Sequence, residues 1–190
     1  NSFGSIIMAG NAAANSVEGF IYTAMNAIHQ AAVSFTSQNA GAGKPERINK
    51  ILYSCLTLCT LIGLTMSFGV TFFSEQLLSV YSSSPTVIAA GQVRLRWVCT
   101  PYFLCGVMEI VMGIMRGLGY SLTPMFVALS GACLFRIVWL KTIFAWNPTM
   151  DTLLLSYVVS WILTTIIHTL TYLYARKTHP LFRKAKEQPA

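Results

Sequence analysis

The chain has 190 residues, of which 54% are hydrophobic and only 10% are charged. Soluble domains carry about 25% charged residues, so we expect an integral membrane protein whose surface largely faces lipid. At about 20 apolar residues for each crossing, the length leaves room for five or six helices and excludes a separate soluble domain. The 13 Lys and Arg residues outnumber the 6 Asp and Glu residues, which gives a net charge of +7.

Long apolar runs, interrupted by Gly, Pro, Asn and charged residues, predict five membrane-spanning helices. These are expected at about 6–38, 51–73, 88–115, 123–145 and 152–174. Helices are expected because a backbone in lipid must satisfy its own hydrogen bonds, and the alternating ten-residue strands of a barrel are absent from the sequence. The predicted breaks at 41–45, 82–85 and 147–148 contain the Gly, Ser, Asn and Pro residues typical of turns and helix caps.

The basic residues are concentrated on one side of the predicted bundle. Nine of the thirteen lie in the first loop, the third loop or the tail: Lys44, Arg47, Lys50, Arg116, Arg176, Lys177, Arg183, Lys184 and Lys186. The second and fourth loops contain Glu75 and Asp151 but no Lys or Arg. By the positive-inside rule, both basic loops and the C-terminal tail at 176–190 are expected to be cytoplasmic. No nucleic-acid motif accompanies these charges, so no nucleic-acid partner is expected.

Five spans with a cytoplasmic C-terminus would place Asn1 outside the membrane. The sequence shows neither an initiator Met nor a signal peptide that would export this end. We therefore expect residues 1–175 to be part of a longer chain with at least one further span upstream.

The first predicted helix carries a polar stripe. Its members recur at three- and four-residue steps, which confines them to an arc of about 80°. They are Asn11, Asn15, Glu18, Tyr22, Asn26 and His29. A carboxylate near the membrane centre is costly unless it faces protein or water, so the stripe should line a cavity or a helix interface. Small polar residues also hold membrane helices together, and that reading stays open for each Asn.

Charged residues also occur within the third and fourth predicted helices. Glu109 shares a helix face with Arg116, and either an ion or proton role or a structural ion pair fits it. Arg136 lies mid-span, so we expect it to face the bundle interior as the partner of a carboxylate or of helix-end carbonyl groups. Three residues near the outer ends are expected to snorkel to the membrane surface: Arg94, Arg96 and Lys141.

The fifth predicted helix has a face rich in aromatic rings and hydroxyl groups. This face contains Tyr157, Ser160, Trp161, Thr164, His168, Thr171 and Tyr172. Such a mixture suits an amphipathic organic ligand, although His29 and His168 fit packing roles as well as proton relays. The sequence contains no His-Glu-x-x-His motif, nucleophile elbow or Walker loop, and no cysteine spacing of a zinc site. Neither an enzyme, a cofactor nor a resident metal is therefore expected.

Two motifs resemble those of the multidrug and toxic compound extrusion (MATE) family. The run 38–44, Gln-Asn-Ala-Gly-Ala-Gly-Lys, resembles the Gln-x-x-Gly-Ala-Gly signature after the second helix of a six-helix repeat. The run 116–125 is similar to Arg-Gly-x-Gly-Asp-Ser-x-x-Pro-Met after the fourth helix, with Tyr120 in place of the Asp. The run 81–87 is similar to the short outer loop before that fourth helix. The resemblance extends over essentially the whole chain.

The resemblance implies a twelve-helix transporter with a substrate cavity between two six-helix lobes. It also implies alternating access driven by a proton or sodium gradient. This all-α chain would supply five transmembrane helices, most of the C-terminal lobe, and its partner would be the missing N-terminal lobe. In one branch of the family, acids on the seventh and tenth helices bind the coupling cation, and Glu109 lies on the tenth; in another branch the coupling acid lies in the N-terminal lobe.

We therefore expect a multi-pass protein of the cytoplasmic membrane that exports drugs or other organic cations by H+- or Na+-coupled antiport. The candidates for ion or proton coupling are Glu18 and Glu109, and Glu109 is also the candidate for binding Na+. The expected cavity lining is Asn11, Asn15, Tyr22, Asn26, His29, Tyr157, Trp161, Thr164 and His168.

Two alternatives remain open. The first is a lipid-linked oligosaccharide flippase of the same superfamily, which would need a wide cationic cavity for a diphosphate, and Arg136 is the one candidate cation for such a cavity. The second is a non-transporting membrane subunit whose polar stripes only hold partner helices.

Overall fold

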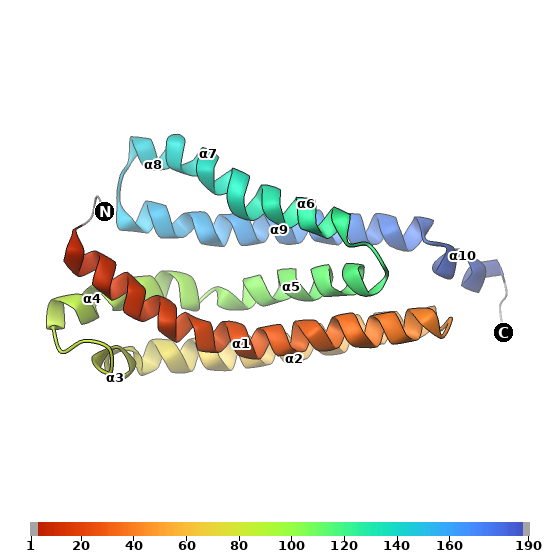
Figure 1. The fold of residues 1–190 in the computed structure, drawn as a ribbon, viewed down its shortest axis with the longest axis horizontal. Helices are drawn as coiled ribbons and strands as arrows, with labels where there is room; N and C mark the ends of the chain where they lie inside the picture. Colours follow the sequence, from red (N-terminus) through yellow and green to blue (C-terminus); the bar gives the residue numbers. More distant parts are fainter. Residues whose placement is uncertain (1–3, 188–190) are drawn as a thin grey trace.

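A computed structural model describes the backbone of residues 4–187 and the side chains as far as Arg183. Within these residues the chain is helical, with no strand (Figure 1). The elements are α1 (Ser5–Gly41), α2 (Pro45–Phe72), α3 (Ser74–Ser79), α4 (Pro85–Arg94), the π-helical η1 (Leu95–Cys99), α5 (Tyr102–Gly117), α6 (Leu122–Leu129), the π-helical η2 (Ser130–Leu134), α7 (Phe135–Lys141), α8 (Ile143–Trp146), α9 (Met150–Thr178) and α10 (Pro180–Glu187).

The helix boundaries follow the local chemistry that the sequence indicates. Pro45 and Pro85 occupy the first turns of α2 and α4, where the missing backbone N–H would have no partner in any case. Gly43 has a φ of 70°, which a glycine adopts without strain, and so permits the tight turn between α1 and α2. Thr149 caps α9 by accepting a hydrogen bond from the backbone N–H of Thr152.

Two of the five predicted helices are interrupted, which corrects the expectation of continuous spans. The span predicted at 88–115 breaks near Pro101, and its two parts are bent by 43°. Proline explains this break because it donates no backbone hydrogen bond and its ring clashes with the preceding turn. The span predicted at 123–145 contains the π-helical η2 between α6 and α7, so the pattern of its backbone hydrogen bonds also changes locally.

The C-terminal residues differ from the predicted tail. α9 continues to Thr178, and therefore includes Arg176 and Lys177, and α10 follows at Pro180–Glu187. Residues 188–190 of the predicted basic tail, and Asn1 at the other end, lie outside the described residues.

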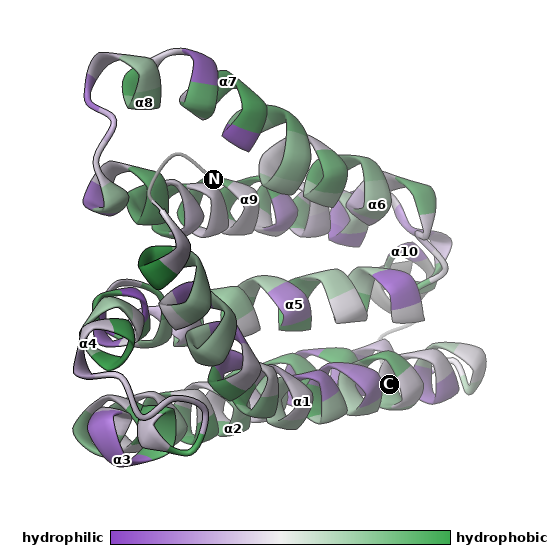
Figure 2. Ribbon diagram, turned by 60° about the vertical axis from the view of Figure 1, so that its left-hand side comes forward, coloured by the Kyte–Doolittle hydropathy of each residue, from purple (hydrophilic) through white to green (hydrophobic). Residues whose placement is uncertain are grey.

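By length and hydropathy, three described helical segments qualify as membrane spans, and the bent pair can count as a fourth. The three are α2, the segment Leu122–Trp146 and α9; the pair is Pro85–Cys99 with Tyr102–Gly117. The remaining predicted span, α1, has 37 residues and is long enough, but its polar stripe lowers its hydropathy. Figure 2 shows this stripe as hydrophilic residues that recur among hydrophobic ones along the helix.

The helix α5 is the centre of the packing. It lies between α1 and α2 on one side and α9 on the other (Figure 1). Ile110, Ile114 and Met115 on α5 are almost completely buried. Residues that the sequence places on separate helices are therefore brought together around α5.

Glycines on α5 allow α1 to approach closely. A methyl group added at Gly117 would lie 2.6 Å from the Cβ atom of Thr36 and 2.8 Å from the carbonyl oxygen of Val33. At Gly113 it would lie 3.0 Å from Nδ1 of His29. Small residues at membrane helix interfaces permit such close backbone contact, and here they allow the part of α1 from His29 to Thr36 to pack closely against α5.

We expect the Gly117→Ala substitution to destabilise the protein by about 1–3 kcal/mol, because the added methyl group overpacks this contact. The midpoint of thermal unfolding in detergent measures the change. Gly19→Ala is the matched control, since no atom lies within 4 Å of the added group. Equal midpoints for the two variants would contradict a close α1–α5 contact.

Candidate functional site

Glu18 on α1 and Arg94 on α4 form a buried ion pair. Nε of Arg94 donates to Oε1 of Glu18 at 2.7 Å, and its Nη2 donates to Oε2 at 3.0 Å. The same Nη2 reaches the side-chain oxygen of Asn15 at 3.4 Å. The side chains of Glu18 and Arg94 are only 8% and 12% exposed.

The expectation that Arg94 snorkels to the membrane surface is wrong. The helices α1 and α4 meet through glycines, because a methyl group added at Gly10 would lie 2.8 Å from the backbone nitrogen of Gly91. This contact turns Arg94 into the bundle, towards Glu18. Arg96 and Lys141, which were expected to snorkel as well, are exposed.

Tyr157 on α9 connects this ion pair to a second arginine. The guanidinium carbon of Arg94 lies 5.6 Å from the centre of the Tyr157 ring, and that of Arg136 lies 3.9 Å from it. Nε and Nη2 of Arg136 both donate to the hydroxyl oxygen of Ser160, at 3.3 and 3.2 Å. Arg136 thus faces inward as expected, but its polar partner is a serine instead of a carboxylate or a helix-end carbonyl.

His29 on α1 contacts Glu109 on α5. Nδ1 of His29 donates to the backbone carbonyl oxygen of Glu109 at 2.7 Å and lies 3.5 Å from its carboxylate oxygen Oε2. A carbonyl oxygen only accepts hydrogen bonds, so this contact fixes the hydrogen on Nδ1. The side chain of His29 is 3% exposed and that of Glu109 is 18% exposed. A titratable pair therefore lies at the edge of the described core.

The polar stripe of α1 divides between two neighbouring helices. Its first part, around Glu18, faces α4, and its last part, at His29, faces α5. Asn15 and Tyr22 are exposed, whereas Asn11 and Asn26 are half-buried. As the sequence predicts for the costly polar groups of the stripe, Glu18 and His29 are buried against other helices.

The α9 residues expected to line a cavity are mostly packed into helix contacts. Trp161 is buried and meets the Tyr102 ring edge-on at 5.3 Å between ring centres. Thr164 is buried against Gly131 of η2, and His168 is fully buried. These three residues are packed against other helices in the described part of the chain, and the cavity-lining role expected for them stays a prediction. Tyr157 is half-buried, and its lining role stays a prediction.

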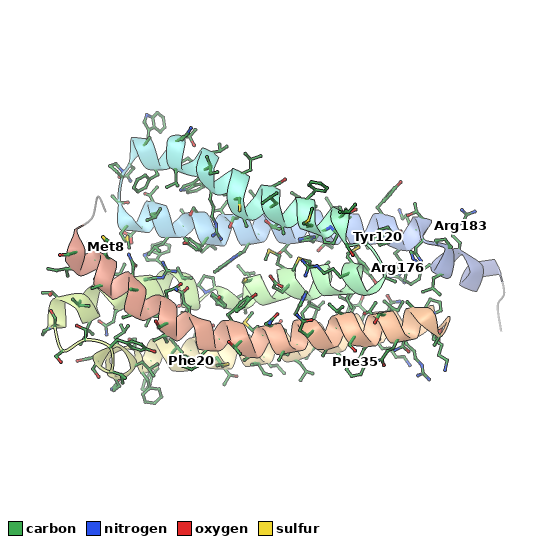
Figure 3. All side chains as sticks on the ribbon, viewed as in Figure 1. Met8, Phe20, Phe35, Tyr120, Arg176 and Arg183 are labelled. Atoms are coloured by element: carbon green, nitrogen blue, oxygen red, sulfur yellow. The ribbon has the colours of Figure 1, made fainter. Side chains whose placement is uncertain are left out.

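Two cavities lie away from all nine expected lining residues. One, of about 450 Å³, lies between α1 and α2, and its lining includes Phe35, Lys50 and Cys55. The other, of about 320 Å³, lies between the end of α5 and α9, and its lining includes Tyr120 and Thr171. Each cavity is lined by residues of more than one helix, so the periodicity of a single helix does not reveal it. In Figure 3, Phe35 lies on the outer side of α1 and Tyr120 beside the end of α9.

No metal-binding cluster is evident in the part of the chain that the structure describes. There, no group of three or more His, Cys, Asp or Glu side chains is placed to hold a metal ion. The two acids inside the bundle have nitrogen partners instead, Arg94 for Glu18 and His29 for Glu109.

We expect Glu18→Gln to destabilise the full-length protein by about 3–5 kcal/mol, because it leaves the Arg94 charge buried without its partner. The double variant Glu18→Gln/Arg94→Gln should recover part of that loss. Thermal unfolding of the wild type, both single variants and the double variant measures the coupling.

Glu75→Gln serves as the control because Glu75 is exposed on α3. A Glu18→Gln variant as stable as this control would contradict a buried ion pair.

Comparisons with known proteins agree with the motifs in the sequence. The MatE family model matches residues 1–140, which contain α1 to α6, η2 and most of α7. The match therefore ends before α9, although the resemblance was expected to extend over the whole chain.

A curated relative is described as "Probable multidrug resistance protein YpnP" of Bacillus subtilis (strain 168), and it is 24% identical over 146 residues. The aligned part covers 77% of this chain and 33% of the relative, so the chain spans about a third of the length of that protein. The family match covers well over half of the chain and includes both the Glu18–Arg94 and the His29–Glu109 contacts; this multi-pass membrane protein belongs to the MatE family.

Proposed function

We propose that the transporter containing this chain exports organic cations across the cytoplasmic membrane in exchange for protons, with Glu109 and His29 forming the proton-binding site. The observation that carries the proposal is the contact of a partly exposed carboxylate with a histidine, on two helices of a MatE protein. In this proposal the C-terminus is cytoplasmic, as the distribution of basic residues predicts.

Glu109 suits proton coupling better than Glu18 does. Arg94 holds Glu18 through two charge-assisted hydrogen bonds, and arginine stays charged throughout the physiological pH range. Glu18 is therefore a fixed ionic contact. The partner of Glu109 is a histidine, a residue type that can both accept and release a proton, and we propose that the number of protons on the Glu109–His29 pair changes during a cycle.

The chemistry of this pair also favours H+ over Na+. Hard cations take several oxygen ligands, whereas the Nδ1–H group of His29 occupies the position beside the Glu109 carbonyl oxygen and carboxylate. Protonation of Glu109 would remove a charge from a partly buried site, which is worth several kcal/mol inside a membrane. A difference of that size is enough to shift the populations of inward- and outward-open states.

The lipid-linked oligosaccharide flippase is less well supported. A diphosphate needs a strongly cationic cavity, but the charge of Arg94 is balanced by Glu18. This leaves Arg136 as the uncompensated cation among the interior residues considered for such a cavity. The cation exporter therefore remains the better proposal.

We expect Glu109→Gln to reduce drug accumulation driven by a pH gradient by about tenfold or more, the size of an ordinary coupling free energy. Exchange of labelled for unlabelled drug, which needs no net proton movement, should persist. The assay uses the full-length transporter in proteoliposomes and a fluorescent organic cation. His29→Asn should give the same phenotype, because Asn can still donate to the Glu109 carbonyl group but does not titrate.

Glu46→Gln is the control, because Glu46 is exposed in the first turn of α2. Gradient-driven transport by Glu109→Gln at the level of this control would contradict the assignment. Equal accumulation by the wild type with and without a gradient would favour the non-transporting subunit.

A further inference from the structure

The cavity of about 450 Å³ between α1 and α2 is an elongated groove. Its lining recurs at four-residue steps, with Ala27, Ala31 and Phe35 on α1 and Lys50, Ser54 and Leu58 on α2. Residues at this spacing lie on one face of a helix, so the lining follows both helices and forms what we name the α1–α2 groove. The helical rise of about 1.5 Å per residue gives the groove a length of about 12 Å between Lys50 and Leu58.

The α1–α2 groove opens on the outside of the bundle. Phe35 and Leu58 are each 52% exposed, and Figure 3 shows Phe35 on the outer side of α1. The lining also includes the buried Cys55, so the groove extends inward from this surface. The whole of α2 belongs to a membrane-span candidate. A length of about 12 Å is close to half of the hydrocarbon core, which is about 30 Å thick, and therefore suits the acyl chain of one leaflet.

A lysine lies at one end of this apolar lining. Lys50 is exposed in the second turn of α2, and the exposed Lys44 and Arg47 come just before it. The same segment contains one acid, Glu46, so this end of the groove has a net positive charge. A lysine can lay its methylene stem along apolar surface while its ammonium group stays at the membrane surface, and basic residues there attract anionic lipid headgroups.

We propose that the α1–α2 groove binds an acyl chain of an anionic phospholipid and that Lys50 binds the headgroup phosphate of the same lipid. A phospholipid satisfies both parts of the groove, because its chain fills the apolar part and its phosphate neutralises the cationic end. An organic cation does not, since the lining contains Lys50 and no acid. By the positive-inside rule this end is cytoplasmic, so the lipid belongs to the cytoplasmic leaflet.

This inference goes beyond the proposed export function and does not depend on it. The groove lies between α1 and α2, whereas the proposed proton-binding pair, His29 and Glu109, joins α1 to α5. Its test measures lipid binding and not transport. A failure of cation export would therefore leave the lipid site standing, and a failure of lipid binding would leave the export proposal standing.

Lipid binding to the full-length protein purified in detergent tests the proposal. Native mass spectrometry compares the retention of dioleoylphosphatidylglycerol, which is anionic, with that of dioleoylphosphatidylcholine, which has the same chains and no net charge. The wild type should retain the anionic lipid preferentially. Lys50→Gln should lower that preference by about fivefold, the effect expected for one basic residue near anionic headgroups.

Lys177→Gln is the matched control for the charge. Lys177 is exposed near the end of α9, on the same side of the membrane in the proposed topology, but it lies outside the lining of both cavities. It should leave the lipid preference unchanged. An equal loss in Lys177→Gln and Lys50→Gln would overturn the proposal, because general attraction of lipid to a basic surface would then explain the binding. An unchanged preference in Lys50→Gln would overturn it as well.

A second pair of variants tests the apolar part of the groove. Ala27→Trp places a large ring in the groove, and Ala12→Trp places one at an exposed position of α1 outside the lining. Ala27→Trp should lose the tightly retained phosphatidylglycerol, whereas Ala12→Trp should keep it. Equal retention by both variants would overturn the proposal, because the lipid would then bind without entering the groove. A wild type with no preference between the two lipids would overturn it too.

Discussion

The ion pair between Glu18 and Arg94 is the contact on which the arrangement of the other polar groups depends. Two opposite charges with little exposure to solvent are stable together, but either one alone would be costly. Their contact fixes α1 against α4 and brings Arg94 to the face of Tyr157 on α9. Polar contacts of Arg94 thus join α1, α4 and α9, which are distant in the sequence.

Two glutamates inside the same bundle differ through their partners. The partner of Glu18 is an arginine, which is always charged, whereas the partner of Glu109 is a histidine. The exposure differs in the same sense, because the side chain of Glu109 is 18% exposed and that of Glu18 is 8% exposed. The same acid therefore has two different environments on adjacent helices, as the proposed division into a structural and a proton-binding glutamate requires.

Local signals in the sequence predicted the helices and most of their breaks, as Pro45, Pro85 and Gly43 illustrate. Helical periodicity also predicted that Glu18 faces protein. The partner of Glu18 was not predictable, because Arg94 lies 76 residues away and the contact depends on how α1 and α4 pack. Periodicity likewise groups His168 with other polar residues but does not reveal that neighbouring helices bury it completely.

The glycines of α5 determine which parts of this lobe can move separately. Because the backbone of Gly117 lies directly against Thr36 and Val33, sliding or rotation of α1 along α5 would produce steric clashes. These two helices should therefore behave as one rigid body during a transport cycle of the proposed kind. The distance between His29 and Glu109 would then be preserved in every state. Motion of α4 and η1 relative to α5 would instead be accommodated at the 43° bend near Pro101, where the series of backbone hydrogen bonds is already interrupted.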